Sequence, residues 1–242
     1  MKPANWDVRI YFVDRGSTDG TSEAIGSLGL NVKISFADSS CSVARAMHQA
    51  EQSIDHEYDV CLWLNDHVVV FQDTYKRLEE FRLQYPSSIL IPQLGNPETG
   101  ELTSGGYELT PGVEFRCEHK YAERLPVDID TFDSNLVLIP QSAANSIGSV
   151  NPDFTDFYSG IDYGLRAKRK RIRAVALPGF FGTCQTAPVF VASNRRDALR
   201  HLHSTIGQPI SQQIQFLVRH ASWRWPINLL VPYLRILFNK TA

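Results

Sequence analysis

Runs of apolar residues alternate with mixed polar segments along most of the chain. Residues 8–13 (VRIYFV) are almost all apolar or β-forming, which is typical of a strand buried on both faces. Similar runs recur, and the segments between them have helical spacing. The pattern predicts strands at 8–14, 32–36, 58–64, 88–93, 135–139 and 172–177, and helices at 19–28, 42–55, 73–84, 141–147 and 161–170.

The last part of the chain has a different pattern. Alternating strands and helices in the first part predict an α/β fold, with a mostly parallel sheet flanked by helices. Residues 102–127 are expected to be irregular or antiparallel. We therefore predict one domain over residues 1–190 and a C-terminal helical appendage over residues 191–242. The helices predicted in this appendage are 194–204, 208–222 and 226–238.

Polar residues follow two predicted strands at their carboxyl ends. Asp14 ends the first strand, and Gly16 and Ser17 follow it in a short turn. Asn65 and Asp66 come directly after the third strand. Ligands of open α/β sheets bind at this edge, so these residues are predicted to contact the base or ribose of a nucleotide. For Asp14 the alternative is an aspartate that only starts a turn.

Several motifs follow one another in an order that is more specific than any one of them. Six motifs occur once each along the chain, in this order: VDRGSTDGT (13–21), LWLNDH (62–67), NLVLIP (135–140), IGSVNPDF (147–154), IDYGLRA (161–167) and ALPGFFGTC (176–184). Together they resemble the family 2 glycosyltransferases of the GT-A fold. The resemblance implies a nucleotide-diphosphate sugar as donor and a glycan or lipid-linked acceptor. It further implies inversion at the transferred sugar, a role in polysaccharide assembly and a divalent metal, Mn²⁺ or Mg²⁺. It places the SGG loop (104–106) near the sugar.

The metal site implied by the resemblance is altered in this chain. Asp66 and His67 stand where the family pattern has two aspartates, so they are the predicted metal ligands. An imidazole can bind Mn²⁺ but suits Mg²⁺ poorly. A solvated loop histidine is the equally open alternative for His67.

The catalytic base is altered as well. The resemblance places it at position 160, which is glycine here. Asp156 and Asp162 are the remaining candidates, although Asp156 is open to interpretation as a turn residue and Asp162 as a group that orients Arg166. A non-catalytic GT-A-fold protein that binds a nucleotide, glycan or protein therefore stays an alternative function. Family members also open with a strand before VDxGSTDGT, so that strand is expected either upstream or lost.

Composition bears on partners and location. The net charge of −2 over 242 residues gives no drive toward nucleic acid, so no nucleic-acid partner is expected. Four widely spaced cysteines without a CxxC pair predict reduced thiols and a cytoplasmic protein. Residues 222–238 are rich in Trp, Leu and Pro. They are predicted either to pack on the domain or to make a peripheral contact with the inner face of a membrane.

Overall fold

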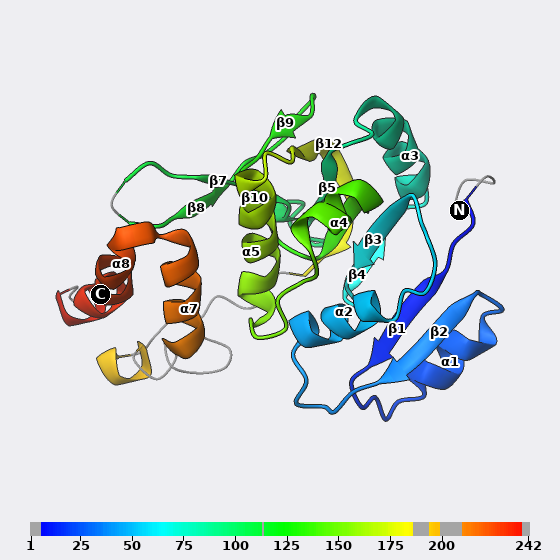
Figure 1. Cartoon of the computed structure of the whole chain (residues 1–242), viewed down its shortest axis with the longest axis horizontal. Coiled ribbons are helices and arrows are strands. Elements are labelled where there is room, and N and C mark those ends of the chain that lie inside the picture. The colour runs from blue at the N-terminus through cyan, green and yellow to red at the C-terminus, as the bar shows by residue number, and fades with distance from the viewer. Residues whose placement is uncertain (1–5, 113, 186–193, 199–209, 239–242) are drawn as a thin grey trace.

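The computed structural model describes residues 6–112, 114–185, 194–198 and 210–238, and Figure 1 shows how its elements are arranged. The chain begins with β1 (Ile10–Asp14), α1 (Thr21–Ser27), β2 (Val32–Phe36), α2 (Val43–Gln52), β3 (Val60–Leu64), β4 (Val68–Val70), α3 (Thr74–Gln84) and β5 (Ile89–Gly95). Short strands follow: β6 (Leu102–Ser104), β7 (Gly106–Leu109), β8 (Cys117–His119), β9 (Val127–Asp128) and β10 (Thr131–Phe132). The rest contains β11 (Leu136–Pro140), α4 (Gln141–Ile147), α5 (Asp156–Arg169), β12 (Ala174–Cys184), α7 (Ile210–His220), the 3-10 turn η1 (Ser222–Arg224) and α8 (Trp225–Phe238).

The strands and helices predicted for the α/β part are present, with ends that move by a few residues. Residues 102–127 contain short antiparallel strands, as one of the two alternatives expected. The sequence pattern predicted neither β4 nor the second half of β12. Of the predicted helix at 194–204, only residues 194–198 belong to the described part of the chain, and 195–198 are helical.

The main sheet is mixed. It has seven strands, with the order β3-β11-β5-β12-β4, β6 beside β5 and β9 beside β12. β5 and β12 run parallel, whereas the pairs β3–β11, β11–β5 and β12–β4 are antiparallel. The strands β1 and β2 form a separate parallel pair, and β10, β7 and β8 form an antiparallel sheet. The α/β fold with flanking helices is therefore confirmed, but the main sheet is mixed rather than mostly parallel.

The strands that end at Asp14 and before Asp66 do not share one sheet, which corrects a sequence-based expectation. Within the described residues β1 pairs only with β2, and β3 pairs only with β11 among the strands. No described strand joins them, and each keeps one edge free of a neighbouring strand. Helix α2 packs against β1, and its Ala44 belongs to the same core cluster as Trp63 of β3. In Figure 1, β1 and β3 run in the same direction, so their carboxyl ends face the same side.

The main sheet is a layer between two apolar cores. Successive residues of a strand point to opposite faces, and β5 follows this rule. Ile89 and Ile91 pack in a core with residues of α2, α4 and α5, whereas Leu90 and Leu94 pack in a second core with Leu78 of α3. All five side chains are almost fully buried, and burying such a side chain stabilises the fold by about 1.5–3 kcal/mol.

Helix α7 lies beside α5, and α8 packs against α7 (Figure 1). A third apolar cluster joins Tyr158 and Ile161 of α5 to Phe216 and Leu217 of α7. The rings of Tyr158 and Phe216 are stacked, with centroids 4.5 Å apart. No helix in the described residues is long and apolar enough to cross a membrane. The predicted division into residues 1–190 and 191–242 stays a prediction.

Candidate functional site

The turn after β1 is organised by the carboxylate of Asp14. This residue is 3% exposed, and its Oδ1 accepts the backbone N–H of Ser17 at 2.7 Å. Its Oδ2 accepts the Ser22 hydroxyl. These bonds, the one from Ser22 foremost, lower the pKa of the Asp14 carboxyl. Gly16 has a φ of 84°, a left-handed conformation that glycine adopts without strain.

Asp14, Gly16 and Ser17 are therefore brought together in one turn, as the sequence predicted. The carboxylate of Asp14 is already engaged by two donors, Ser17 in the turn and Ser22 in the first turn of α1. It holds the backbone of residues 16–17 in place, so that exposed groups of the turn are presented to solvent. A direct contact between Asp14 and a nucleotide remains a prediction.

The turn between β3 and β4 carries Asn65, Asp66 and His67. The side chains of Asp66 and His67 are 80% and 50% exposed, and Nδ1 of the imidazole lies 3.2 Å from Oδ1 of Asp66. Asn65 anchors the turn, because its N–H donates to the carbonyl of Asn135 at 3.0 Å and its Nδ2 donates to Oδ1 of Asn135 at 2.8 Å. An anchored turn thus presents two adjacent exposed metal-binding groups.

The side chains at this turn supply only part of the ligand set of the divalent metal that the resemblance implies. Within the described residues, no group of three or more His, Cys, Asp and Glu side chains is placed to hold a metal ion. Asp66 and His67 supply two donors of the kind that suits Mn²⁺. A metal at this turn would therefore need diphosphate or water oxygens for its other ligands. The fit is partial, and Asp66 and His67 as metal ligands stay a prediction.

A second polar cluster lies next to this turn and was missed in the sequence. Oδ1 of Asp133 accepts the Ser104 hydroxyl at 2.6 Å and the N–H of Asn135 at 3.2 Å, and Oδ2 accepts the N–H of Gly105 at 2.8 Å. Nδ2 of Asn135 donates to Oγ of Ser104 at 3.1 Å. Since Asn135 also holds Asn65, the cluster and the turn form one hydrogen-bonded unit.

The charge state of Asp133 is perturbed. Burial raises the pKa of its carboxyl, and the hydrogen bonds from Ser104, Gly105 and Asn135 oppose this shift without cancelling it. Perturbed carboxyl groups are enriched at functional sites. Two sequence features could have indicated this cluster. They are the SGG loop (104–106), which the resemblance places near the sugar, and the polar DSN triplet (133–135) before a strand.

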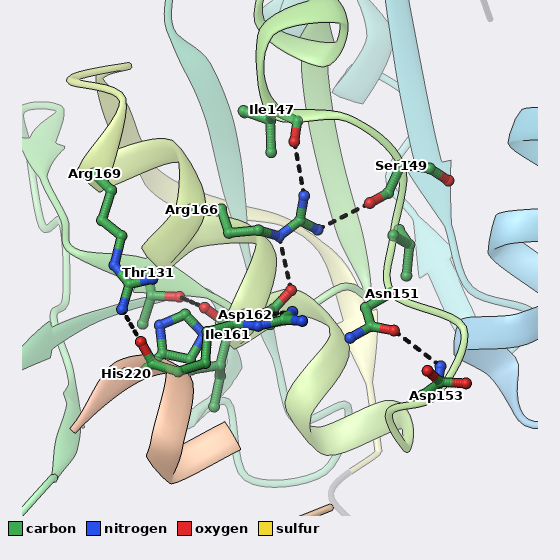
Figure 2. Close-up of polar contacts among 12 residues, drawn as sticks. Thr131, Ile147, Ser149, Asn151, Asp153, Ile161, Asp162, Arg166, Arg169 and His220 are labelled. Atoms are coloured by element: carbon green, nitrogen blue, oxygen red, sulfur yellow. Dashed lines mark hydrogen bonds and ion pairs between the residues drawn. The ribbon is translucent and has the colours of Figure 1, made fainter. Parts of the chain in front are cut away.

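Helix α5 carries the two residues predicted to be catalytic. Asp162 is fully buried and accepts Nε of Arg166 at 2.8 Å, an Nη of Arg219 at 3.0 Å and Nε2 of His220 at 2.8 Å (Figure 2). Arg166 in turn donates to the carbonyls of Ile147 and Ser149. Burial acts to raise the pKa of Asp162, but the bond from His220 and the charge of Arg166 outweigh it, and the pKa is lowered.

This geometry makes Asp162 a link between α5, α7 and the segment after α4. All its bonds are directed to the protein interior, which matches the sequence alternative of a group that orients Arg166. Asp156 begins α5, but its side chain lies outside the described part of the structure. A catalytic role for Asp156 or Asp162 remains a prediction.

One cavity of about 350 Å³ lies beside His220, the partner of Asp162. It is found between the β7–β8 hairpin and α7, η1 and α8, and Phe115, His220 and Trp223 are among the residues that line it. None of the site residues predicted from the sequence lines this cavity.

Comparisons with known proteins identify the fold. The chain is similar to a structure of GalNAc-T7 with UDP, GalNAc and Mn²⁺, with 12% identity and a TM-score of 0.57 over 94% of this chain and 51% of that one. It is also similar to S. aureus TarS 1–349, with 16% identity and a TM-score of 0.51 over 95% of this chain and 72% of that one. A second structure of S. aureus TarS gives 14% identity, a TM-score of 0.55, and coverage of 95% and 43%.

The fold is of the GT-A type. This chain spans about half the length of the GalNAc-T7 structure that it matches. No protein-family model matches the chain, and no curated protein matches it. At these identities the likeness concerns the fold alone. The predicted GT-A fold is therefore confirmed, whereas membership of family 2 stays a prediction.

Proposed function

We propose that this protein transfers a sugar from a nucleotide-diphosphate donor to a glycan or lipid-linked acceptor, with inversion at the sugar. The observation that carries the proposal is the anchored turn Asn65–His67, which presents Asp66 and His67 at the carboxyl end of β3. In α/β sheets this is the position at which nucleotides bind. The GT-A type of the fold, which the matched structure with UDP and Mn²⁺ shares, supports the same assignment.

Each residue predicted to bind the donor or the metal has a part in this proposal. The turn that Asp14 holds, with Gly16 and Ser17, contacts the base and ribose. Asn65 positions Asp66, which contacts the ribose or, with His67, a Mn²⁺ ion. When bound, such a metal neutralises the charge that develops on the diphosphate leaving group. The protein groups bind the donor, orient the sugar toward its acceptor and keep the diphosphate at the turn.

A non-catalytic role is the alternative, in which the same turns bind a nucleotide, glycan or protein without turnover. The glycine at position 160 favours it, because no side chain there can accept a proton. Where the bound ligand is a nucleotide, the two functions predict the same site and differ only in turnover.

Isothermal titration calorimetry tests the proposed site. We expect UDP, GDP or dTDP to bind in the presence of Mn²⁺, and Asp66→Asn to weaken that binding about 10-fold or more. Asp59→Asn is the matched control, because Asp59 is an exposed aspartate just before the opposite end of β3. Absence of binding by all three nucleotides, or equal losses in both variants, would contradict the proposal.

We further propose that α8 contacts an anionic membrane surface, as a peripheral protein would. Trp223, Ile227, Leu230, Leu234 and Leu237 recur at helical spacing and are 41–72% exposed. Residues 221–242 contain three basic residues and no acidic one. Arg235 pairs with Glu114, and the positive charge of the others is complementary to anionic lipid. Exposed apolar and aromatic residues on one helical face are typical of helices that lie in a membrane interface. A cytoplasmic location fits this proposal and remains a prediction.

A further inference from the structure

The contact between α5 and the segment before β11 leaves no room for a side chain at position 160. A Cβ on Gly160 would lie 2.7 Å from the carbonyl carbon of Asp133 and from the N of Ser134. One turn later, a Cβ on Gly164 would lie 2.4 Å from Oγ1 of Thr131. The backbone of residues 131–134 therefore fills the space in which an acidic side chain at position 160 would stand.

Asp133 lies at this contact and carries a carboxylate. Its two oxygens accept three hydrogen bonds, from Ser104, Gly105 and Asn135, at 2.6 to 3.2 Å. An ionised carboxylate has about four acceptor positions, so these donors fix its orientation without using its full capacity. The residue as a whole is neither fully buried nor exposed.

The groups that face Asp133 come from three strands. Tyr107 of β7, His119 of β8 and Cys184 of β12 interact with it electrostatically. Burial lowers the pKa of His119, which disfavours its cationic form. Burial also raises the pKa of the Cys184 thiol. No arginine or lysine pairs with Asp133 within the described part of the chain, so the carboxylate stays available as a proton acceptor.

We propose that Asp133 is the general base of this protein, which takes over the function that Gly160 cannot perform. The proposal rests on the proposed glycosyl transfer. In that step the acceptor oxygen forms a bond to the anomeric carbon of the donor sugar. The bond from that carbon to the diphosphate oxygen breaks, and its electron pair leaves with the nucleoside diphosphate. The proton of the acceptor hydroxyl moves to a carboxylate oxygen of Asp133.

The cluster couples this base to the donor turn. Asn135 bonds both the Asp133–Ser104 pair and Asn65, the residue that precedes Asp66. These hydrogen bonds tie the carboxylate to the turn at which we propose that the donor binds. The raised pKa of Asp133 makes it a stronger base than an ordinary aspartate, which suits proton abstraction near neutral pH.

The test measures nucleoside diphosphate release from a panel of UDP-, GDP- and dTDP-hexoses, with water as acceptor, together with donor binding by calorimetry. We expect Asp133→Asn to bind donor like the wild type and to lose turnover by ~10²–10⁴-fold. The wild-type rate should rise with pH through the pKa of Asp133, and the asparagine variant should lose this rise. Asp128→Asn, an exposed aspartate on the neighbouring β9, is the control and should keep full turnover.

The pH dependence of turnover in Ser104→Ala distinguishes a general base from a residue with only a structural role. The substitution removes a hydrogen bond that stabilises the charged carboxylate, so the pH at which turnover rises should shift upward. Thermal unfolding of each variant shows whether it is folded. Donor binding without turnover by the wild type, or an Asp133→Asn variant that keeps both rate and pH profile, overturns this inference alone. Absence of donor binding overturns the proposed function together with it.

Discussion

Glycine is required at position 160 because α5 packs directly on the backbone of residues 132–134. Replacing Gly160 with alanine should destabilise the protein by about 1–3 kcal/mol, the usual cost of overpacking. Gly26→Ala is the matched control, since its Cβ would lie 4.0 Å from the nearest atom in a helix of ordinary φ. It should be neutral or stabilising by up to about 1 kcal/mol. Urea unfolding of both variants measures the difference.

The contact at Gly160 also determines the expected effect of placing an aspartate at this position. The sequence suggests that Gly160→Asp restores a missing base. The structure places backbone where that aspartate would stand, so we expect Gly160→Asp to unfold the α5 contact and to restore no turnover. A folded Gly160→Asp protein with increased turnover would contradict this account of the glycine.

His67 is the residue that sets the metal preference, if the Asn65–His67 turn holds a metal. An imidazole favours Mn²⁺ over Mg²⁺, and His67→Asp adds a carboxylate that suits Mg²⁺. Calorimetric titration of UDP with each metal should show preference for Mn²⁺ in the wild type and a shift toward Mg²⁺ in the variant. Unchanged nucleotide binding in the presence of a chelator, in both proteins, would remove the metal from the account.

Among the elements, α5 and α7 are joined by a buried charged cluster that makes their contact sensitive to acid. The folded state lowers the pKa of Asp162 below its usual 3.8, so this stabilisation is present above that pH and is lost as the pH falls through the lowered value. Burial lowers the pKa of His220 from 6.5, although its bond to Asp162 opposes the shift. Stability should therefore begin to fall as the pH drops below 6.5. Arg166, Arg169 and Arg219 are the other charges that face this pair.

Thermal unfolding between pH 7 and pH 4, followed by Trp fluorescence, checks this expectation. His220→Gln keeps a neutral donor near Asp162 and should flatten the fall in melting temperature below pH 6.5. His67→Gln is the control, because that histidine is half exposed and should leave the profile unchanged. Asp162→Asn should destabilise at all pH values above the usual aspartate range, by about 3 kcal/mol or less, since Arg219 is partly exposed.

Vesicle sedimentation tests whether the exposed apolar face of α8 binds a membrane. Vesicles that contain anionic lipid should sediment the wild-type protein, and Leu230→Ser with Leu234→Ser should reduce the bound fraction several-fold. Leu28→Ser is the control, since Leu28 is an exposed apolar residue elsewhere, just after α1. Equal sedimentation with purely zwitterionic vesicles would contradict the role of charge. Concentration-dependent dimers without vesicle binding would replace the membrane with a second copy.

At the scale of the whole molecule, the continuous apolar strands were predictable, and the way they pair was not. Runs such as Ile89–Gly95 are buried on both faces, so their sequence alone identifies them. The strands between Leu102 and Phe132 have two to four residues each, too few for a period to be recognised. The antiparallel place of β11 depends on the chain returning through these strands rather than through a helix.

Part of the candidate site could also be predicted from the sequence, and part could not. Asp14 and Asp66 could be predicted as candidates because Asp14 ends one apolar strand and Asp66 comes two residues after another. The Ser104–Asp133 bond could not, because these residues are 29 positions apart and meet only through the folded chain. The missing side chain at position 160 is evident from the sequence, but its cause, the backbone of residues 132–134 in the same space, arises only in the folded chain.

The most direct test of the central claim is a crystal structure of the protein with a nucleoside diphosphate that binds it and with Mn²⁺. The account predicts the diphosphate at the Asn65–His67 turn, the base and ribose at the turn that Asp14 holds, and Asp133 facing the open side of the diphosphate. A nucleotide in the cavity beside Trp223, or anywhere remote from both turns, would contradict it.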